Sequence, residues 1–272
     1  EQVSRTLEYA FDDFALSRIA IKRGDTKNAV ALSTRAMNYH NVYSPADSAV
    51  RGVYANGTFI EKYDKYKKAS FITEGTPYQY TWYVPQDVAG LAMLMGGDDG
   101  FNRNLDNFHA TEQYWHGNEP GHQIPFLYNY SGQPWKTQKL VGEVMQNEYG
   151  TGIGGLSGND DAGQMSAWYV FAAMGFYPVA PSVPEYVISG PRFDKLTIQL
   201  PESKTLTILA KGASSGKNFI QSLTWNGELT DKNFLNHFDI NKGGTLMFIM
   251  GETPNMNWGV AKESRPFSLS GE

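Results

Sequence analysis

Three segments of the chain place polar groups in otherwise uncharged, aromatic surroundings. In the first, the stretch from Ala69 to Gly97, the only formally charged residues are Glu74 and Asp87. A lone Glu74 beside a Gly-Thr-Pro turn is expected to be partly desolvated by the neighbouring rings of Tyr78, Tyr80, Trp82 and Tyr83. Desolvation raises a carboxyl pKa, which suits a general acid working near neutrality. The alternative is a solvated loop residue that caps a neighbouring helix.

The second segment runs from His116 through a row of aromatic residues to Tyr130. Two histidines, an Asn, a Glu and a Gln fall within its first eight residues, without the spacing of a metalloprotease zinc site. Amide and carboxylate oxygens suit a hard cation such as calcium, and they also suit sugar hydroxyls. The alternative is a helix N-terminus at which Asn118 and Glu119 satisfy backbone donors.

The third segment is rich in glycine, and its only charged residues between Tyr149 and Pro184 are Asp160 and Asp161. It does not match a phosphate-binding loop, because no Gly-Lys-Ser/Thr follows. Adjacent acids at the start of a helix are often only caps. Paired with a distant acid such as Glu74, they fit a carboxylate base that activates water, which is the arrangement of a glycosidase.

Composition limits the class of protein. The chain has 272 residues, 41% hydrophobic and 19% charged, so we expect a globular protein with two domains. A net charge of −5 argues against nucleic acid as a partner, and no apolar run is long enough for a membrane span. The absence of cysteine excludes disulfides and thiolate zinc sites. The first residues, Glu1-Gln-Val-Ser, are polar and lack an initial Met, so we expect a processed or truncated N-terminus.

The elements that must position these segments are predicted to be helices in the first two thirds of the sequence and strands in the last third. Periodicity and caps predict helices over residues 3–23, 27–39, 85–96, 100–110, 122–131, 135–148 and 162–174. Such a series favours an α/α toroid. Five short alternating segments between about 180 and 265 predict a small antiparallel β domain, with a hairpin at Asn226-Gly227. The predicted boundaries are 1–178 and 179–272.

Three motifs in this order resemble glycoside hydrolase family 92, calcium-dependent exo-α-mannosidases that invert anomeric configuration. They are Glu74-Gly-Thr-Pro-Tyr-Gln-Tyr-Thr-Trp, Gly117-Asn-Glu-Pro-Gly-His-Gln-Ile-Pro and Gly158-Asn-Asp-Asp-Ala-Gly-Gln-Met-Ser-Ala-Trp. The resemblance covers nearly the whole chain, from Val3 onward. It implies the C-terminal part of a longer enzyme: about half of a six-fold α/α barrel, followed by the small β domain.

The resemblance also implies a role for each matching residue. Glu74 is similar to the general acid and Asp161 to the general base, with Asp160 or Asn159 holding the water or the metal. The implied wall of the sugar pocket comprises Trp82, Trp115, His116, Asn118 and Glu119. The implied ligands of Ca²⁺ are Asn118, Gln123 and Asn159. One departure is Gly121-His122-Gln123, where the family usually has Ser-His-His, and it leaves the role of that third position open.

The implied substrates are α-mannosides such as N-glycans or yeast-type mannan. Alternatives are a relative that cleaves mannosyl phosphodiesters, or a catalytically silent carbohydrate-binding fragment. Retention of both Glu74 and Asp161 favours the mannosidase. We further expect a periplasmic, cell-surface or secreted bacterial protein. Its partner would be the missing N-terminal part of the enzyme, without which this chain is expected to be inactive.

Overall fold

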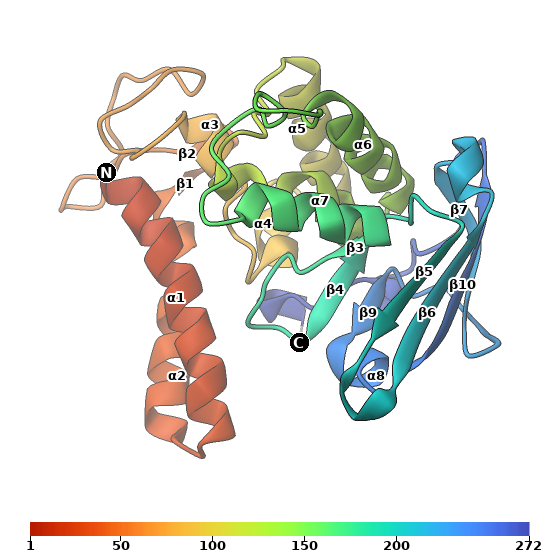
Figure 1. The fold of residues 1–272 in the computed structure, drawn as a ribbon. Helices are drawn as coiled ribbons and strands as arrows, with labels where there is room; N and C mark the ends of the chain where they lie inside the picture. Colours follow the sequence, from red (N-terminus) through yellow and green to blue (C-terminus); the bar gives the residue numbers. More distant parts are fainter. Residues whose placement is uncertain (272) are drawn as a thin grey trace. The chain divides into compact units, whose positions relative to one another are not determined.

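The computed structural model describes residues 1–271, which form two compact units (Figure 1). The first unit comprises residues 1–115 and the C-terminal residues from Ser268, and the second comprises His116–Phe267. The predicted boundary after residue 178 falls inside the second unit. The division into a half-barrel and a β domain therefore stays a prediction, and each unit is described by itself.

The first unit is helical. Helices α1 (Gln2–Lys22) and α2 (Thr26–Arg35) pack side by side as a hairpin (Figure 1). The unit also contains the 3-10 helix Asn38–Val42, strands β1 (Tyr43–Ser44) and β2 (Ala49–Val50), helices α3 (Pro77–Tyr80), α4 (Val88–Leu94) and α5 (Asp98–Ala110), and the 3-10 turn Leu269–Gly271. Asp25 caps α2 by accepting a hydrogen bond from the Asn28 amide, as helix N-termini require.

Helix α1 buries one stripe of its surface. Val3, Leu7, Ala10 and Phe14 are buried at helical spacing, which confirms the predicted amphipathic helix. Ile19 does not belong to this stripe, and it is 56% exposed. The stripe continues through Ser17 instead, and a residue two positions later points to the opposite side of a helix.

A buried carboxylate fixes the C-terminal residues to the first unit. Asp87 is fully buried, and its two oxygens accept hydrogen bonds from the Tyr39 hydroxyl, the Gly90 amide and three groups of Ser268 and Ser270. Several charge-assisted bonds compensate a carboxylate for the loss of water. Asp87, one of the two acids of the first segment, is therefore a structural residue.

The second unit combines helices with two sheets. Its helices are α6 (Pro134–Asn147), α7 (Gln164–Met174) and α8 (His237–Ile240), with 3-10 helices at Glu119–Gly121, Ile124–Ser131, Pro201–Ser203, Ala213–Ser215 and Lys262–Ser264. Its strands are β3 (Phe176–Tyr177), β4 (Glu185–Ile188), β5 (Lys195–Gln199), β6 (Thr205–Lys211), β7 (Phe219–Trp225), β8 (Glu228–Thr230), β9 (Phe234–Asn236) and β10 (Gly244–Gly251).

The larger sheet has the strand order β5-β6-β10-β7-β8, and the smaller has the order β3-β4-β9. The hairpin at Asn226-Gly227 is confirmed: Trp225 pairs with Glu228, and both turn residues have positive φ. The predicted antiparallel pairing is confirmed for the strands of residues 1–271 with one exception, because β10 pairs with β6 in parallel. A crossover through β7, β8, β9 and α8 returns the chain to the middle of the sheet, where it runs beside β6 in the same direction.

The segment predicted as a helix over 122–131 is a 3-10 helix at Ile124–Ser131. All its residues are buried, so it has no polar face, and Pro125 lacks an amide donor. Asn129 and Asn233 fix it by reciprocal bonds, since each side-chain amide donates to the other residue's backbone carbonyl at 3.0 Å. Among residues 1–271, no helix has the length and apolar character of a membrane span.

Candidate functional site

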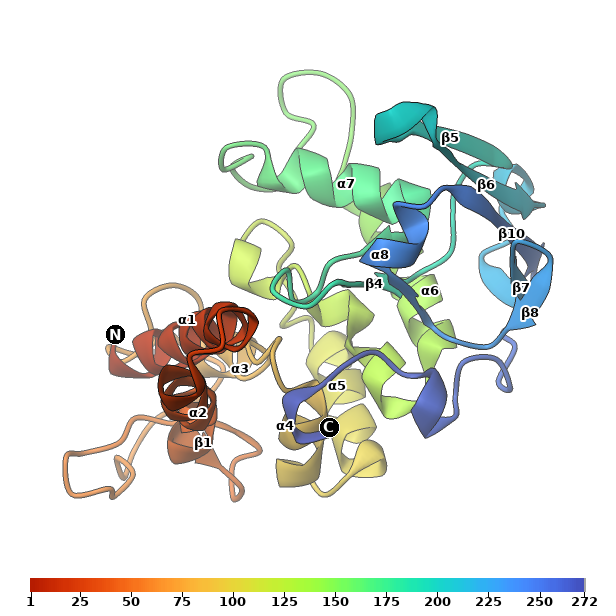
Figure 2. The ribbon, with the colours of Figure 1, turned by 90° about the horizontal axis from the view of Figure 1, so that it is seen from below.

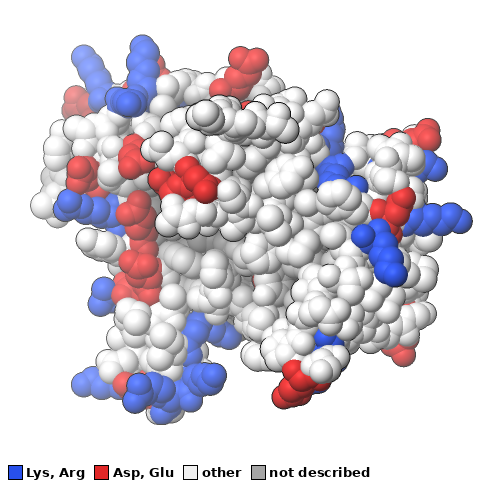
Figure 3. Space-filling view, viewed as in Figure 1, with Lys and Arg blue, Asp and Glu red and all other residues white. Residues whose placement is uncertain are grey.

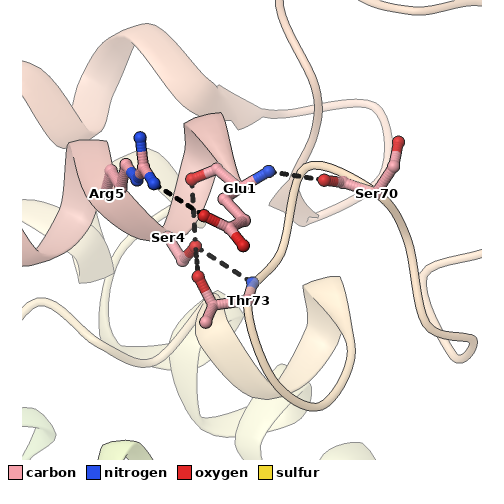
Figure 4. A network of polar contacts seen from close by, with 5 residues as sticks. All are labelled: Glu1, Ser4, Arg5, Ser70 and Thr73. Atoms are coloured by element: carbon pink, nitrogen blue, oxygen red, sulfur yellow. Dashed lines mark hydrogen bonds and ion pairs between the residues drawn. The ribbon is translucent and has the colours of Figure 1, made fainter.

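The loop that carries Glu74 is fixed on its N-terminal side by helix α1. Ser4 is fully buried, and its Oγ lies 2.8 Å from the Thr73 hydroxyl and accepts a hydrogen bond from the Thr73 amide at 3.1 Å (Figure 4). The Val3 amide donates to the carbonyl of Phe71 at 2.9 Å. The residue directly before Glu74 is thus tied to the first turn of α1.

The same loop is fixed on its C-terminal side by a capping box. The Thr76 hydroxyl accepts from the Gln79 amide, and the Gln79 Oε1 accepts from the Thr76 amide at 2.8 Å. Gln79 also donates from Nε2 to the carbonyl of Gln113 at 2.9 Å. A side chain at Gly75, where φ is +75°, would collide with Gln79. Glu74 therefore sits between two fixed points.

Glu74 itself is exposed within the first unit, so the expected desolvation by neighbouring rings is wrong there. Tyr78 and Trp82 are fully buried and turned towards the core, where Trp82 packs edge-on against Phe101 at 5.4 Å between ring centroids. Rings that pack a core have no face left for a sugar, so Trp82 is better explained as a core residue. Trp115, by contrast, is 51% exposed.

Other acids lie near Glu74. The pKa of Glu8 is raised chiefly by burial and further by the charges of Asp12 and Glu74, whereas a hydrogen bond from Tyr80 opposes the rise. Figure 3 shows acidic side chains along α1, with basic side chains at the far end of the α1–α2 hairpin. The surroundings of Glu74 in this unit are therefore acidic.

The second motif is held in place by a buried pair of histidines. His116 and His122 are at most 1% exposed, and their rings stack with centroids 4.7 Å apart. The Trp168 ring of α7 meets the edge of His116 at 4.4 Å, and its indole N–H donates to the carbonyl of His122. These contacts attach residues 116–123 to helix α7.

Hydrogen bonds assign the proton of each imidazole. The Tyr149 hydroxyl donates to the carbonyl of Met165, so it can only accept from Nε2 of His116, 2.6 Å away. Nε2 of His122 donates to the carbonyl of His116, while its Nδ1 accepts from the Gln164 amide at 3.1 Å. Burial, helped by the neighbouring His122, lowers the pKa of His116 to about 3. Both rings are thus neutral Nε2–H tautomers.

The second and third motifs meet where two glycines touch. A Cβ built on Gly158 would lie 2.5 Å from the Cα of Gly117, closer than any real side chain approaches. Only glycine permits such an approach of two backbones. Asn118 and Asn159, the residues that follow these glycines, are therefore brought to neighbouring positions.

Asp160 and Asp161 form a strained turn directly before α7. Asp161, Ala162 and Gly163 have consecutive positive φ angles of 44°, 57° and 95°, a conformation that costs energy at the two residues with side chains. Asp160 accepts from the Ser166 amide at 2.9 Å and so caps α7. Asp161 is exposed, and its charge acts on His122. Of the two acids, Asp160 is occupied by the helix and Asp161 is the one available to a ligand.

No group of three or more acidic or histidine side chains within residues 1–271 is arranged to hold a metal. Asn118 and Asn159, near the Asp160-Asp161 turn, carry amide oxygens, a ligand type that suits calcium rather than zinc. Gln123 is buried, and its Nε2 donates to the carbonyl of Pro120.

The structure thus brings His116, Asn118, Asn159 and Asp161 into one neighbourhood of the second unit, whereas Glu74, Trp82 and Trp115 belong to the first. Sequence reasoning missed five supporting residues: Ser4, Gln79, Tyr149, Gln164 and Trp168. The Thr76-Pro-Tyr-Gln79 spacing could have identified Gln79 as half of a capping box. Nothing local marks the other four, because their partners are distant in sequence.

Comparison with known proteins assigns the family. The model of the glycosyl hydrolase family 92 catalytic domain matches residues 1–252. The chain belongs to glycosyl hydrolase family 92. Two solved structures are similar to this family 92 chain over 98% of its length with TM-scores of 0.93: an inverting mannosidase from Bacteroides thetaiotaomicron at 35% identity, and an α-mannosidase of the same bacterium at 38%. The latter has also been solved with mannoimidazole bound.

A curated relative is an uncharacterized secreted glycosidase of Arthroderma benhamiae, 29% identical over 98% of this chain. The family 92 chain spans only 38% of that relative, and 40% and 37% of the two Bacteroides proteins. These matches confirm the predicted family. The whole-barrel architecture and the C-terminal placement of the chain stay predictions.

The contact between Gly117 and Gly158 can be tested by a matched pair of substitutions. Gly158→Ala forces the two backbones apart, and we expect it to lower the free energy of unfolding by about 1–3 kcal/mol, as overpacking does. Gly154→Ala is the control, because no atom lies within 4 Å of its Cβ, and it should stay within about 0.5 kcal/mol of the parent. The measurement is urea denaturation. Equal effects of the two substitutions would show that the glycines do not hold the motifs together.

Proposed function

We propose that the intact protein is a calcium-dependent exo-α-mannosidase that hydrolyses its substrate with inversion. The observation that carries the proposal is the pair of carboxylates, Glu74 and Asp161, on separately anchored loops of a family 92 chain. Mannosidase relatives of known structure support mannose as the sugar released. N-glycans and yeast-type mannan are the proposed substrates. Activity is assigned to the intact protein, since this chain spans about two fifths of those relatives.

The proposed reaction is a single displacement. Glu74 donates its proton to the glycosidic oxygen as the bond from that oxygen to the anomeric carbon breaks. Asp161 takes a proton from the water whose oxygen forms the new bond to that carbon, on the opposite face of the ring. One water is consumed, and the sugar leaves with inverted configuration. Such a mechanism requires the two carboxyl groups to lie roughly 6.5–9.5 Å apart in the intact site.

Around the sugar, the proposed wall is formed by Trp115, Asn118 and Glu119, all of which are at least partly exposed. His116 is assigned a positioning role instead, because its ring is buried and its Nε2–H is bonded to Tyr149. The strained backbone at Asp161 supports its role as the base, since such strain tends to occur at functional sites. Asp160 is proposed to position Asp161 through the cap of α7.

Calcium is proposed to be held by Asn118, Gln123 and Asn159, whose amide oxygens suit a hard cation. When bound, the cation would orient the sugar hydroxyls and help to distort the ring towards its oxocarbenium-like transition state. The small number of side-chain ligands leaves coordination positions for those hydroxyls. A relative that cleaves mannosyl phosphodiesters is disfavoured, because a phosphate leaving group has little need of the acid that Glu74 supplies.

A further part of the same enzyme is the proposed partner of the first unit. Leu16, Ile19 and Ile21 of α1 and Val30 of α2 are each more than half exposed. Ile21 and Val30 line an open, mainly apolar groove along α2. Apolar surface of this kind usually marks an interaction site. We propose that this surface binds the further part of the enzyme, and the chain alone is therefore expected to be inactive.

We also propose that the protein is exported, as the name of the Arthroderma relative states for that protein.

The acid can be tested with substrates that differ in their leaving group. Glu74→Gln in the intact protein should reduce cleavage of a mannobiose by about 10²- to 10⁴-fold, the usual contribution of a positioned acid. Cleavage of an aryl mannoside with an acidic phenol should fall far less, because that leaving group needs no proton. Glu61→Gln, at another exposed glutamate of the same unit, is the control. Equal losses on both substrates would contradict the assignment of Glu74.

Metal dependence provides a second test. A chelator should abolish mannoside hydrolysis, and added Ca²⁺ should restore it, because oxygen donors favour calcium over softer cations. Asn159→Ala should raise the Ca²⁺ concentration needed for half-maximal activity by at least about tenfold, or roughly 1.4 kcal/mol of binding. Asn147→Ala, at an exposed asparagine ending α6, should leave it unchanged. Restoration by Zn²⁺ but not Ca²⁺ would refute the calcium site.

A further inference from the structure

A cavity of about 270 Å³ in the second unit lies between the edge strands of its two sheets. Its lining comes from the β7–β8 hairpin, helix α8 and strand β10, which are labelled in Figure 2, and from strand β9, which is labelled in Figure 1. None of the residues assigned to catalysis, sugar binding or calcium lines it. The volume is just below the roughly 300–1,000 Å³ of typical small-molecule sites, so any ligand is small.

Strand register explains how the cavity combines a ring with a carboxylate. Leu246, Trp225 and Glu228 are paired in a row across β10, β7 and β8, and residues paired in this way share one face of a sheet. Trp225 is half-buried against the core of the sheet, and Glu228 is exposed at the rim. The cavity therefore has an apolar floor, an aromatic wall and an acidic rim.

Several polar groups of the cavity are uncommitted. Within residues 1–271, Glu228 forms no ion pair, and the indole N–H of Trp225 has no hydrogen-bond partner. Asn236 uses only its Oδ1, which caps α8, so its side-chain amide N–H groups remain available. Asp239 pairs through one oxygen with Lys242 and keeps the other. Uncommitted donors and acceptors thus line the same cavity as the half-buried ring.

We propose that this cavity binds one neutral sugar ring, at a second carbohydrate site distinct from the catalytic one. A pyranose has an apolar face of C–H groups that can lie against an indole, and hydroxyls that donate to carboxylates and accept from N–H groups. An anion is disfavoured by Glu228 and Asp239. A cation is disfavoured because Nζ of Lys232 already lies 5.5 Å from the centroid of the Phe234 ring.

The choice of mannose as that sugar rests on the proposed function, whereas the site itself does not. A glycan carries many mannose residues, so a second site would hold one branch while the chain end is cleaved. The link between the two sites would raise the local concentration of chain ends near the catalytic carboxylates. The expected gain is a lower KM on branched glycans, with no change for a small aryl mannoside.

The test is calorimetric titration of the intact protein with methyl α-D-mannoside, in a chelator that disables the calcium-dependent site. We expect binding with a Kd on the order of 1 mM. Glu228→Ala should weaken it by about tenfold or more, as loss of a hydrogen bond to a charged group does, and Trp225→Phe should also weaken it. Phe238→Ala is the control, because that ring is 64% exposed in the same unit but lies outside the cavity.

Binding that is unaffected by Glu228→Ala and Trp225→Phe would overturn the proposal, as would the absence of binding to any neutral methyl hexoside. Binding of choline in place of sugars would overturn it as well. Binding of methyl α-D-glucoside but not of the mannoside would support a sugar site while contradicting mannose as its ligand. If the protein binds sugar at this cavity but hydrolyses no mannoside, the proposed function is wrong and the proposal of this site still holds.

Discussion

In the second unit, the placement of the two candidate site motifs depends on one close contact between backbone segments, at Gly117 and Gly158. Where two backbone segments lie too close for a Cβ on Gly158, the residues beside them have little freedom to move apart. Asn118 and the Asn159-Asp160-Asp161 turn are thereby held together, although about forty residues separate them in the sequence. The two neutral histidines next to this contact pack against Tyr149 and Trp168. These contacts attach the second motif to α7.

In the first unit, hydrogen bonds hold the loop that carries Glu74 in place. Glu74 lies on an exposed loop, and exposed loops are usually mobile. In this loop Ser4 fixes the residue before Glu74, and the Thr76–Gln79 capping box fixes the residues after it. In both units the carboxylate assigned to chemistry is exposed, while Ser4 in the first unit and His116 and Trp168 in the second, which help to hold the loops, are buried. This separation lets a carboxylate meet a ligand without losing its position.

Sequence reasoning predicted the helices well wherever a polar face alternates with an apolar one, as in α1, α5 and α6. It failed for Ile124–Ser131, because a segment buried on every side carries no periodic signal. It failed for the parallel pairing of β10 with β6, because register across a crossover depends on tertiary packing. Trp82 was placed at the sugar on motif likeness alone, and only its burial among Tyr78, Phe101 and Phe108 assigns it to the core.

The central claim is that Glu74 and Asp161 act on opposite faces of one sugar in a single displacement. The most direct measurement is the anomeric configuration of the mannose first released by the intact protein from an α-mannoside. Proton NMR can record it before mutarotation scrambles the product. The account predicts β-mannose as the initial product, because water attacks opposite to the departing group. Initial release of α-mannose would mean a double displacement, and it would contradict the roles assigned to both carboxylates.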